Sequence, residues 1–354
     1  MKNSIWLAWR NFVIGALLLV LTSCTFPLTP PITPTPPNAA ADLDAFALNQ
    51  RLGRGINLGN ALEAPTEGAW GLYLQAEHFQ IIADAGFNSV RVPIRWSAHA
   101  MKRAPNTIDP RFFERIDWAV DQALAHHLLV ILDTHNFEEV NSEPVLFRDR
   151  FLAIWQQIAE HYQSRPPEVL FELFNEPNGV KMDENWNGLL QAGIAEIRKT
   201  NPTRTLIVGP TEWNNIYRLH NLELPAADQH LIVTFHYYEP FHFTHQGADW
   251  AEGSTAWLGT TWTGTAAEKS AVEQDFAAAA SWAKQHKRPL FLGEFGAYSR
   301  ADLTSRATWT AFVARTAEAQ GFSWAYWEFG SGFGAYDRAR KAWNEPLRKA
   351  LLGP

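Results

Sequence analysis

Residues 128–135 read LLVILDTH, and this stretch decides the fold. Its apolar core is continuous and contains β-branched residues, which is typical of a parallel strand that is buried on both faces. The run then gives way to the polar His135. In α/β domains, polar side chains at the carboxyl ends of buried parallel strands form the ligand site. We therefore expect a buried parallel sheet with a ligand site at the carboxyl ends of its strands.

Similar apolar runs recur along the chain and alternate with amphipathic stretches. The predicted strands are residues 54–60, 88–93, 128–135, 169–175, 205–210, 231–237, 289–295 and 322–328. The predicted helices are 74–85, 111–127, 148–163, 183–200, 268–286 and 304–320, whereas 211–230 is less helical. Eight such units in about 300 residues predict an α/β fold, a (β/α)₈ TIM barrel with a single catalytic domain.

A doubly wound open sheet is the alternative architecture. Gly53 and Gly55 begin like a dinucleotide-binding fingerprint, but position 58 is Leu and these glycines precede the first strand instead of following it. A phosphate-binding loop of the Walker type is also missing. The sequence therefore favours the closed barrel.

Composition excludes several classes of protein. The formal net charge is −7, and no basic block stands out, so nucleic acid is not an expected partner. Cys24 is the one cysteine, which excludes an intrachain disulfide and a cysteine-based zinc site.

The N-terminal residues have the pattern of a targeting segment. A basic start and the apolar run FVIGALLLVL at 12–21 indicate a signal peptide over 1–24. The segment ends in Leu-Thr-Ser-Cys24, which resembles a bacterial lipobox with Cys24 as the lipidated residue; an ordinary signal peptide with a chance cysteine is the alternative. Residues 25–41 are rich in Pro and Thr and predict an extended linker, and 42–354 form the catalytic domain. We expect a secreted or cell-envelope protein, lipid-anchored on the extracytoplasmic side, with no other contact to a membrane.

Polar or aromatic side chains follow seven of the eight apolar runs. At any single strand end, such a residue is usually a turn former, but a set contributed by seven strands indicates an active site. The set is Asn57, Asn60, Arg91, His135, Asn136, Asn175, Glu176, His236, Tyr238, Glu294 and Trp327.

Two carboxylates in this set suggest the chemistry. Glu176 and Glu294 are expected at the ends of the fourth and seventh strands, facing each other across the mouth of the barrel. Retaining glycosidases use two carboxyl groups about 5 Å apart, one as nucleophile and one as acid/base. We predict that Arg91, with His236 and Tyr238, keeps Glu294 ionised, and that Glu176 has a raised pKa.

At this point the chain resembles glycoside hydrolase family 5. LFNEP at 173–177 and GEFG at 293–296 are similar to the two catalytic signatures of that family. VRVPIRW, LDTH, FHYY and AYWEF fall where the family keeps its other active-site residues, and the resemblance runs from about Leu52 to the C-terminus. GRGINLGNALEAP at 53–65 is similar to members with mixed β-glucan and mannan activity.

The resemblance implies a role for each matching residue. Glu176 would be the proton donor and Glu294 the nucleophile, supported by Arg91, His135, Asn175, His236, Tyr238 and Trp327. Sugar contacts would come from Asn60, Glu63, Asn136, His245 and Trp250. In those relatives a second His follows His135, whereas this chain has Asn136, which puts a mannan activity in doubt.

Three indoles crowd the loop after the sixth strand: Trp250, Trp257 and Trp262. Sugar faces are apolar, so indoles stack on glycans, and we expect this most for Trp250. The alternative is that they pin the loop onto the barrel.

The predicted activity is retaining endo-hydrolysis of β-1,4-glucan by a monomer that needs no metal or cofactor. A mannanase or xyloglucanase using the same site and a non-catalytic glycan-binding barrel are the alternatives. For metals, His126 and His127 are adjacent and cannot both face one ion, and no carboxylate at ligand spacing joins His242 and His245.

Overall fold

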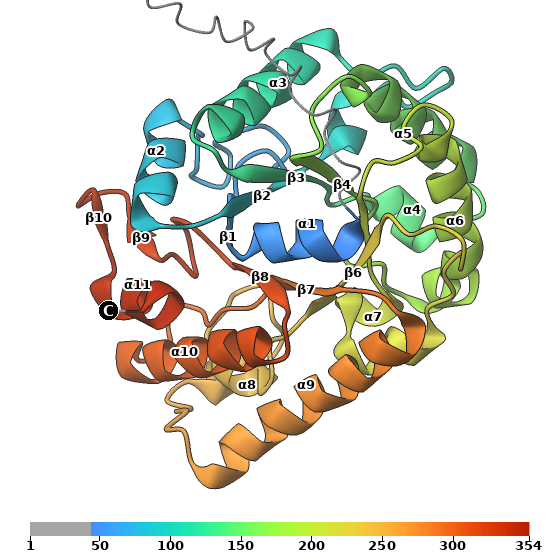
Figure 1. Cartoon of the computed structure of the whole chain (residues 1–354). Helices are drawn as coiled ribbons and strands as arrows, with labels where there is room; N and C mark the ends of the chain where they lie inside the picture. The colour runs from blue at the N-terminus through green and yellow to red at the C-terminus, as the bar shows by residue number, and fades with distance from the viewer. Residues whose placement is uncertain (1–43, 354) are drawn as a thin grey trace, which may run out of the picture. The chain divides into compact units, whose positions relative to one another are not determined.

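A computed structural model gives the fold of the chain and describes residues 44–353. The predicted α/β barrel is confirmed: eight parallel strands close into a ring in the order β1 to β8 (Figure 1). The strands are β1 Arg54–Asn57, β2 Ser89–Ile94, β3 Leu129–Thr134, β4 Val169–Glu172, β5 Leu206–Val208, β6 Leu231–His236, β7 Leu290–Glu294 and β8 Ser323–Tyr326. A short hairpin, β9 Tyr336–Asp337 with β10 Ala342–Trp343, follows the barrel.

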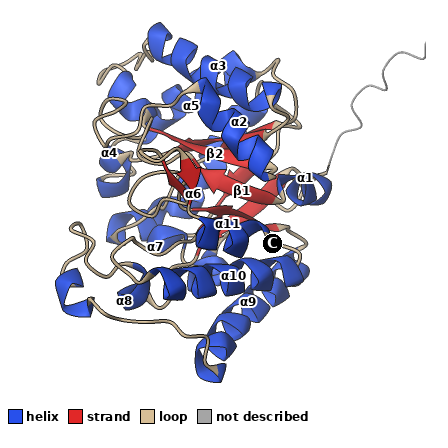
Figure 2. Cartoon of the chain, turned by 90° about the vertical axis from the view of Figure 1, so that its left-hand side faces the viewer, coloured by secondary structure: helices blue, strands red, loops and turns tan. Residues whose placement is uncertain are grey.

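Helices surround the strands, as the side view in Figure 2 shows. They are α1 Ala45–Leu52, α2 Ala76–Ala85, α3 Pro110–Ala125, α4 Glu138–Ser142, α5 Arg148–Tyr162, α6 Val180–Arg198, α7 Thr211–Asn214, α8 Phe241–Thr244, α9 Ala266–His286, α10 Leu303–Ala319 and α11 Glu345–Leu352. Short 3₁₀ turns are η1 Trp96–His99, η2 Ile216–Asn221 and η3 Ser254–Trp257. The six predicted helices are present, and the weakly helical fifth crossover contains only α7 and η2.

Local sequence signals explain where the helices begin. Asp109 caps α3, because its side chain accepts a hydrogen bond from the backbone N–H of Arg111, and Pro110 occupies the first turn. Thr265 and Glu268 form a reciprocal capping box at the start of α9.

Helix α1 closes one end of the barrel. Its buried Ala45, Leu48 and Leu52 pack against the side chains that fill the barrel interior, and Figure 1 shows α1 lying across the ring. The interior side chains in this cluster are Leu129, Ile131, Leu170, Ile207, Ile232, Phe291 and Ala325. With this end sealed by apolar packing, a substrate can enter only at the carboxyl ends of the strands.

The predicted strand ends need one correction. Glu294 is the last residue of β7, as expected, but β4 ends at Glu172 and Glu176 lies four residues beyond it. The backbone N–H of Leu173 still bonds to β5 and that of Asn175 to β3, so the chain stays between its neighbours. At Glu176 the backbone turns left-handed, with φ 48°, and leaves the barrel wall.

The predicted signal peptide, linker and lipidated Cys24 lie outside the described residues. Over residues 44–353, no helix is both long and apolar enough to cross a membrane.

Candidate active site

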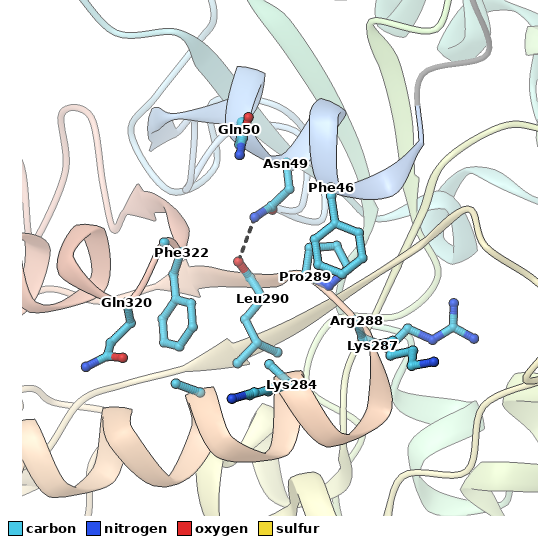
Figure 3. Close-up of a pocket in the computed structure, with 13 residues that line it drawn as sticks. Phe46, Asn49, Gln50, Lys284, Lys287, Arg288, Pro289, Leu290, Gln320 and Phe322 are labelled. Carbon is cyan, nitrogen blue, oxygen red and sulfur yellow. Dashed lines mark hydrogen bonds between the residues drawn. The ribbon is translucent and has the colours of Figure 1, made fainter.

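A cleft of about 780 Å³ opens at the carboxyl ends of the strands. It contains ten of the residues that the sequence singled out: Asn60, Glu63, His135, Asn136, Glu176, Tyr238, His245, Trp250, Glu294 and Trp327. A cavity at the opposite end, beside α1, has a different character (Figure 3). Its lining includes Lys284, Lys287 and Arg288 but no carboxylate, so this cavity lacks the paired acids.

Arg91 is the electrostatic centre of the site. It lies within β2, and its side chain is fully buried. Nη1 donates to Oε1 of Glu294 at 2.8 Å, and Tyr238 donates to the other oxygen, Oε2, at 2.9 Å. Both contacts favour the ionised form of the Glu294 carboxylate.

The other N–H groups of Arg91 bind residues of the neighbouring strands. Nε and Nη2 hold both oxygens of Glu172, at 2.6 and 2.8 Å. Nη2 also donates to Oδ1 of Asn175 at 2.8 Å, and Nη1 to Oδ1 of Asn57 at 2.9 Å. Since an arginine has five N–H donors, this network commits every one of them.

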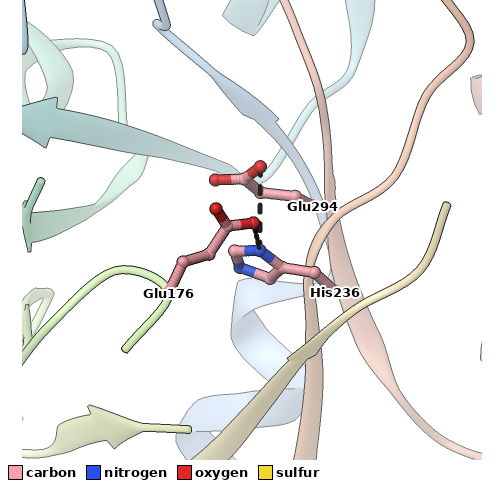
Figure 4. Close-up of side chains that lie close together, drawn as sticks. All are labelled: Glu176, His236 and Glu294. Carbon is pink, nitrogen blue, oxygen red and sulfur yellow. Dashed lines mark hydrogen bonds and ion pairs between the residues drawn. The ribbon is translucent and has the colours of Figure 1, made fainter. Parts of the chain in front are cut away.

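Glu176 has a different environment. His236, at the end of β6, places Nδ1 2.7 Å from Oε1 of Glu176 and 3.7 Å from Oε2 of Glu294 (Figure 4). The expectation that His236 pairs with Glu294 therefore needs correction, because its hydrogen bond goes to Glu176. The left-handed turn after β4 brings Glu176 over β6 and accounts for this pairing.

The titration of the two glutamates follows from these surroundings. Burial raises the pKa of Glu176 to about 7, against smaller effects of His135 and Arg91. Burial also raises the pKa of Glu294, while His236 and Arg91 oppose the shift. Burial lowers the pKa of His236 to about 4, so this imidazole is neutral near pH 7. Glu176 can therefore carry a proton near neutral pH while Glu294 is held by a permanent cation.

His135 lines the cleft, and the buried Asn175 lies next to it. Nδ1 of His135 lies 2.5 Å from Oδ2 of Asp133, and Nε2 lies 3.2 Å from Nδ2 of Asn175. The ring of His135 is nearly parallel to that of Trp327, with centroids 5.8 Å apart. These contacts surround the space in front of Glu294 with fixed side chains.

The loop after β1 adds a buried acid to the cleft. Glu63 accepts hydrogen bonds from the backbone N–H groups of Asn60 and Ala61. Burial raises the pKa of Glu63 to about 8, against these hydrogen bonds. Asn136 donates to the backbone oxygen of Glu63 at 3.3 Å, so the predicted sugar contacts Asn60, Glu63 and Asn136 lie together.

The three indoles of the β6 loop have different environments. Trp250 is 60% exposed and lines the cleft, whereas Trp262 is 1% exposed and packs on Phe312. Trp257 is partly exposed and stacks on His242. The stacking role considered for Trp262 is therefore wrong, because its ring lies in the core. His245 is buried beside Tyr238, with ring centroids 4.9 Å apart.

Some residues of the site escaped the sequence analysis. Asp133 and Glu172 are fully buried acids inside apolar strands. Charged residues are rare in such strands, so their presence in the sequence could have marked them as part of the site. Glu328 accepts from the backbone N–H groups of Gly330, Ser331 and Phe333 and so anchors the loop after β8.

Trp213 was missed as well, and local sequence gave no signal for it. It is 57% exposed and lines a cavity of about 540 Å³ that shares Glu176, Tyr238, His245 and Trp250 with the main cleft. Its backbone is left-handed, with φ 61°, like that of both neighbours. Strain of this kind concentrates at functional sites.

Within the described chain, one cluster has the donors for a metal ion: Glu176, His236 and Glu294, with ligand atoms within 4.8 Å of one another. These are the groups already bound to each other and to Arg91.

The sequence model described as Cellulase (glycosyl hydrolase family 5) matches residues 54–332. The chain belongs to this family. Among curated members, endoglucanase H of Acetivibrio thermocellus is 36% identical over 91% of this chain, which spans about a third (35%) of that protein.

Solved structures superpose on most of this chain. Thermotoga maritima Cel5A in complex with cellobiose has a TM-score of 0.86 and 48% identity, covering 87% of this chain and 100% of that one. The cellulose synthase subunit Z of Clostridioides difficile has a TM-score of 0.82 and 41% identity, covering 85% and 99%.

Proposed function

We propose that this protein is a retaining endo-β-1,4-glucanase. The observation that carries the proposal is the placement of Glu176 and Glu294, whose oxygens lie within 4.8 Å of each other in an open cleft. Retaining enzymes hold their carboxyl groups about 5–5.5 Å apart, whereas inverting enzymes leave about 6.5–9.5 Å for a water molecule. The short separation supports direct attack by one carboxylate.

In the first step, an oxygen of Glu294 attacks the anomeric carbon and forms a glycosyl ester. The glycosidic C–O bond breaks, and the leaving oxygen takes the proton of Glu176. In the second step, Glu176 accepts a proton from water as that water attacks the same carbon, and Glu294 is released as a carboxylate. The contacts of Arg91 and Tyr238 support the nucleophile, and the raised pKa of Glu176 supports the acid.

The cleft favours internal cleavage of a chain. The two cavities meet at Glu176, so a glycan can pass on both sides of the catalytic pair. Trp250 and Trp213 offer exposed indoles toward this passage. Endo-acting enzymes need such binding surface on both sides of the scissile bond.

The names of the relatives support a glucan substrate. They include endoglucanases, and T. maritima Cel5A has been solved with cellobiose and also with mannotriose. A β-mannanase activity is therefore the second candidate. Asn136 is the residue of interest, since it lines the cleft with its amide bonded to Glu63.

The direct test is reducing-end release from carboxymethylcellulose, barley β-glucan, glucomannan and xyloglucan by one purified preparation. We expect release from the glucans by wild type and none by Glu294→Ala. Azide replaces the lost nucleophile, so chain cleavage by Glu294→Ala should partly recover in azide, measured as formation of a glycosyl azide and loss of viscosity. If wild-type protein binds these glycans but releases nothing, the chain is a glycan-binding barrel and the proposal fails.

We further propose that the protein is secreted and anchored through a lipid on Cys24, with Pro- and Thr-rich residues 25–41 as spacer. The support is the lone cysteine at the end of an apolar N-terminal run. Cys24→Ala should release the protein from the membrane fraction. A wild-type protein that is already soluble and starts well past Cys24 would contradict this. The enzyme should sediment as a monomer.

A further inference from the structure

Asp133 has no assigned role, yet it is fully buried at the heart of the site. Its Oδ2 lies 2.5 Å from Nδ1 of His135 and 3.0 Å from Nη2 of Arg91. The N–H groups of Arg91 are already committed to other acceptors, so Arg91 offers Asp133 charge but no free donor. Oδ1 of Asp133 has no hydrogen-bond partner. The hydrogen bond of Asp133 is therefore the one to His135.

The orientation of the Asn175 amide follows from Arg91. A guanidinium group has only donors, so the atom of Asn175 that it contacts at 2.8 Å must be the oxygen. The amide nitrogen then faces Nε2 of His135, at 3.2 Å. One N–H of Asn175 is used by His135, and the second remains for a ligand.

The tautomer of His135 follows in turn. Because Nε2 faces an N–H donor, it must carry the lone pair, and the proton of the neutral imidazole must be on Nδ1. That proton points at Oδ2 of Asp133. Asp133 thus selects the tautomer that lets His135 accept from Asn175.

We propose that Asp133 is a positioning residue that, through His135, orients the amide of Asn175 toward the 2-hydroxyl of the sugar next to the cleaved bond. The proposal rests on the proposed glycosidase function. Hydrogen bonds to this hydroxyl strengthen in the transition state, so a misdirected amide reduces the rate of the chemical step.

The charged groups that act on Asp133 are Arg91 on β2, Glu172 on β4 and Glu176 beyond the end of β4. Burial raises the pKa of Asp133 to about 7, while Arg91 lowers it and Glu176 raises it. Burial lowers the pKa of His135 to about 4, which agrees with a neutral ring.

The tautomer is tested on the intact enzyme by ¹⁵N NMR of the histidine rings, with His135→Gln assigning the signal. We expect the proton of His135 on Nδ1 in wild type and in Asp133→Asn, whose amide oxygen still accepts. It should move to Nε2 in Asp133→Leu. A wild-type proton on Nε2 would overturn the proposal, and this measurement needs no variant of Asp133 to fold.

The kinetic test uses dinitrophenyl β-cellobioside, whose leaving group needs no acid. Asp133→Leu should lower kcat/KM by about 100-fold, since small misplacements cost this much. Asp133→Asn should recover most of it. The 2-deoxy-2-fluoro substrate lacks the hydroxyl and inactivates the enzyme by trapping the glycosyl ester. The rate constants with which it inactivates Asp133→Leu and wild type should differ by less than about tenfold. An equal loss on both substrates would show a merely structural role and overturn the proposal.

Asp117→Asn is the matched control. Asp117 binds His161 at 2.9 Å on the outer helices α3 and α5, so it reproduces an Asp–His pair away from the cleft. Asp117→Asn should leave kcat/KM for the cellobioside and the rate of inactivation by the fluoro substrate unchanged. If wild type itself does not turn over the cellobioside, the proposed function fails, whereas the NMR measurement still decides whether Asp133 sets the tautomer.

Discussion

Arg91 donates to Glu294 at 2.8 Å across the barrel from β2 to β7, and this contact separates the two glutamates electrostatically. Glu294 has a permanent cation and the Tyr238 hydroxyl as partners. Glu176 has the neutral imidazole of His236. One carboxyl group is therefore prepared to remain ionised, and the other can hold a proton when the substrate arrives.

The pH dependence of kcat/KM should reveal this difference. The pKa of Glu176 is raised to about 7, so the carboxyl is protonated below that pH and loses its proton above it. Activity should therefore fall as the pH rises through about 7. Wild type should show this alkaline limb on barley β-glucan but not on dinitrophenyl β-cellobioside, because the leaving group of the cellobioside needs no acid. Glu176→Ala should retain turnover of the cellobioside and lose turnover of the glucan. An equal alkaline limb on both substrates in wild type would assign the titration to another group.

Arg91→Lys should destabilise the fold as well as reduce activity. The guanidinium group of Arg91 donates to Glu172 and Glu294 at the same time, which a lysine ammonium cannot reproduce. The two buried carboxylates would therefore lose hydrogen bonds that offset the cost of their burial. We expect about 3–5 kcal/mol loss in the free energy of unfolding, measured with urea. Arg111→Lys is the control, since Arg111 is 85% exposed and pairs only with Asp109 at the start of α3. Comparable losses in the two variants would contradict this account of the Arg91 network.

Stability should decrease as the pH rises from about 6.5 to about 8. Burial raises the pKa of Glu63 to about 8 and the pKa of Asp133, Glu176 and Glu328 to about 7. The native state therefore binds more protons than the unfolded state in this range and loses stability as they leave. Below about pH 6.5, histidines such as His245, whose pKa burial lowers to about 4, oppose the trend.

Urea unfolding between pH 6.5 and 8 checks this slope. Glu63→Gln should flatten its upper part, because the amide does not titrate. A wild-type stability that rises over this range would mean that the buried acids are already ionised at pH 6.5.

Much of the fold could be predicted because barrel strands are continuous apolar runs and outer helices are amphipathic. The run at 128–135 gave β3, and Asp109-Pro110 gave the start of α3. The exact end of β4 could not be predicted, since Leu173 and Phe174 continue the apolar pattern after the regular strand has ended at Glu172. The left-handed turn at Glu176 depends on packing between neighbouring strands, which local pattern does not encode.

The candidate site could be predicted only as far as polar residues follow strands. That rule placed His135, Glu176 and Glu294 in one cleft. It could not predict that His236 bonds to Glu176 rather than to Glu294. Both glutamates lie near His236, and only the tertiary geometry shows which of them is closer. It also missed Trp213, whose exposure depends on an irregular backbone after β5.

Trp250 and Trp262 provide a matched pair for separating binding from stability. Trp262 is buried on Phe312, so Trp262→Ala should cost about 3–5 kcal/mol of unfolding free energy while leaving the KM for β-glucan unchanged. Trp250 is exposed in the cleft beside Tyr298, so Trp250→Ala should leave stability within about 0.5 kcal/mol and raise KM. About a tenfold rise corresponds to the loss of about 1.4 kcal/mol of apolar contact with one sugar face. Urea unfolding and β-glucan kinetics on the same preparations measure both quantities. If Trp250→Ala destabilises the fold and spares KM, this indole pins the loop, and the glycan must be held elsewhere along the cleft.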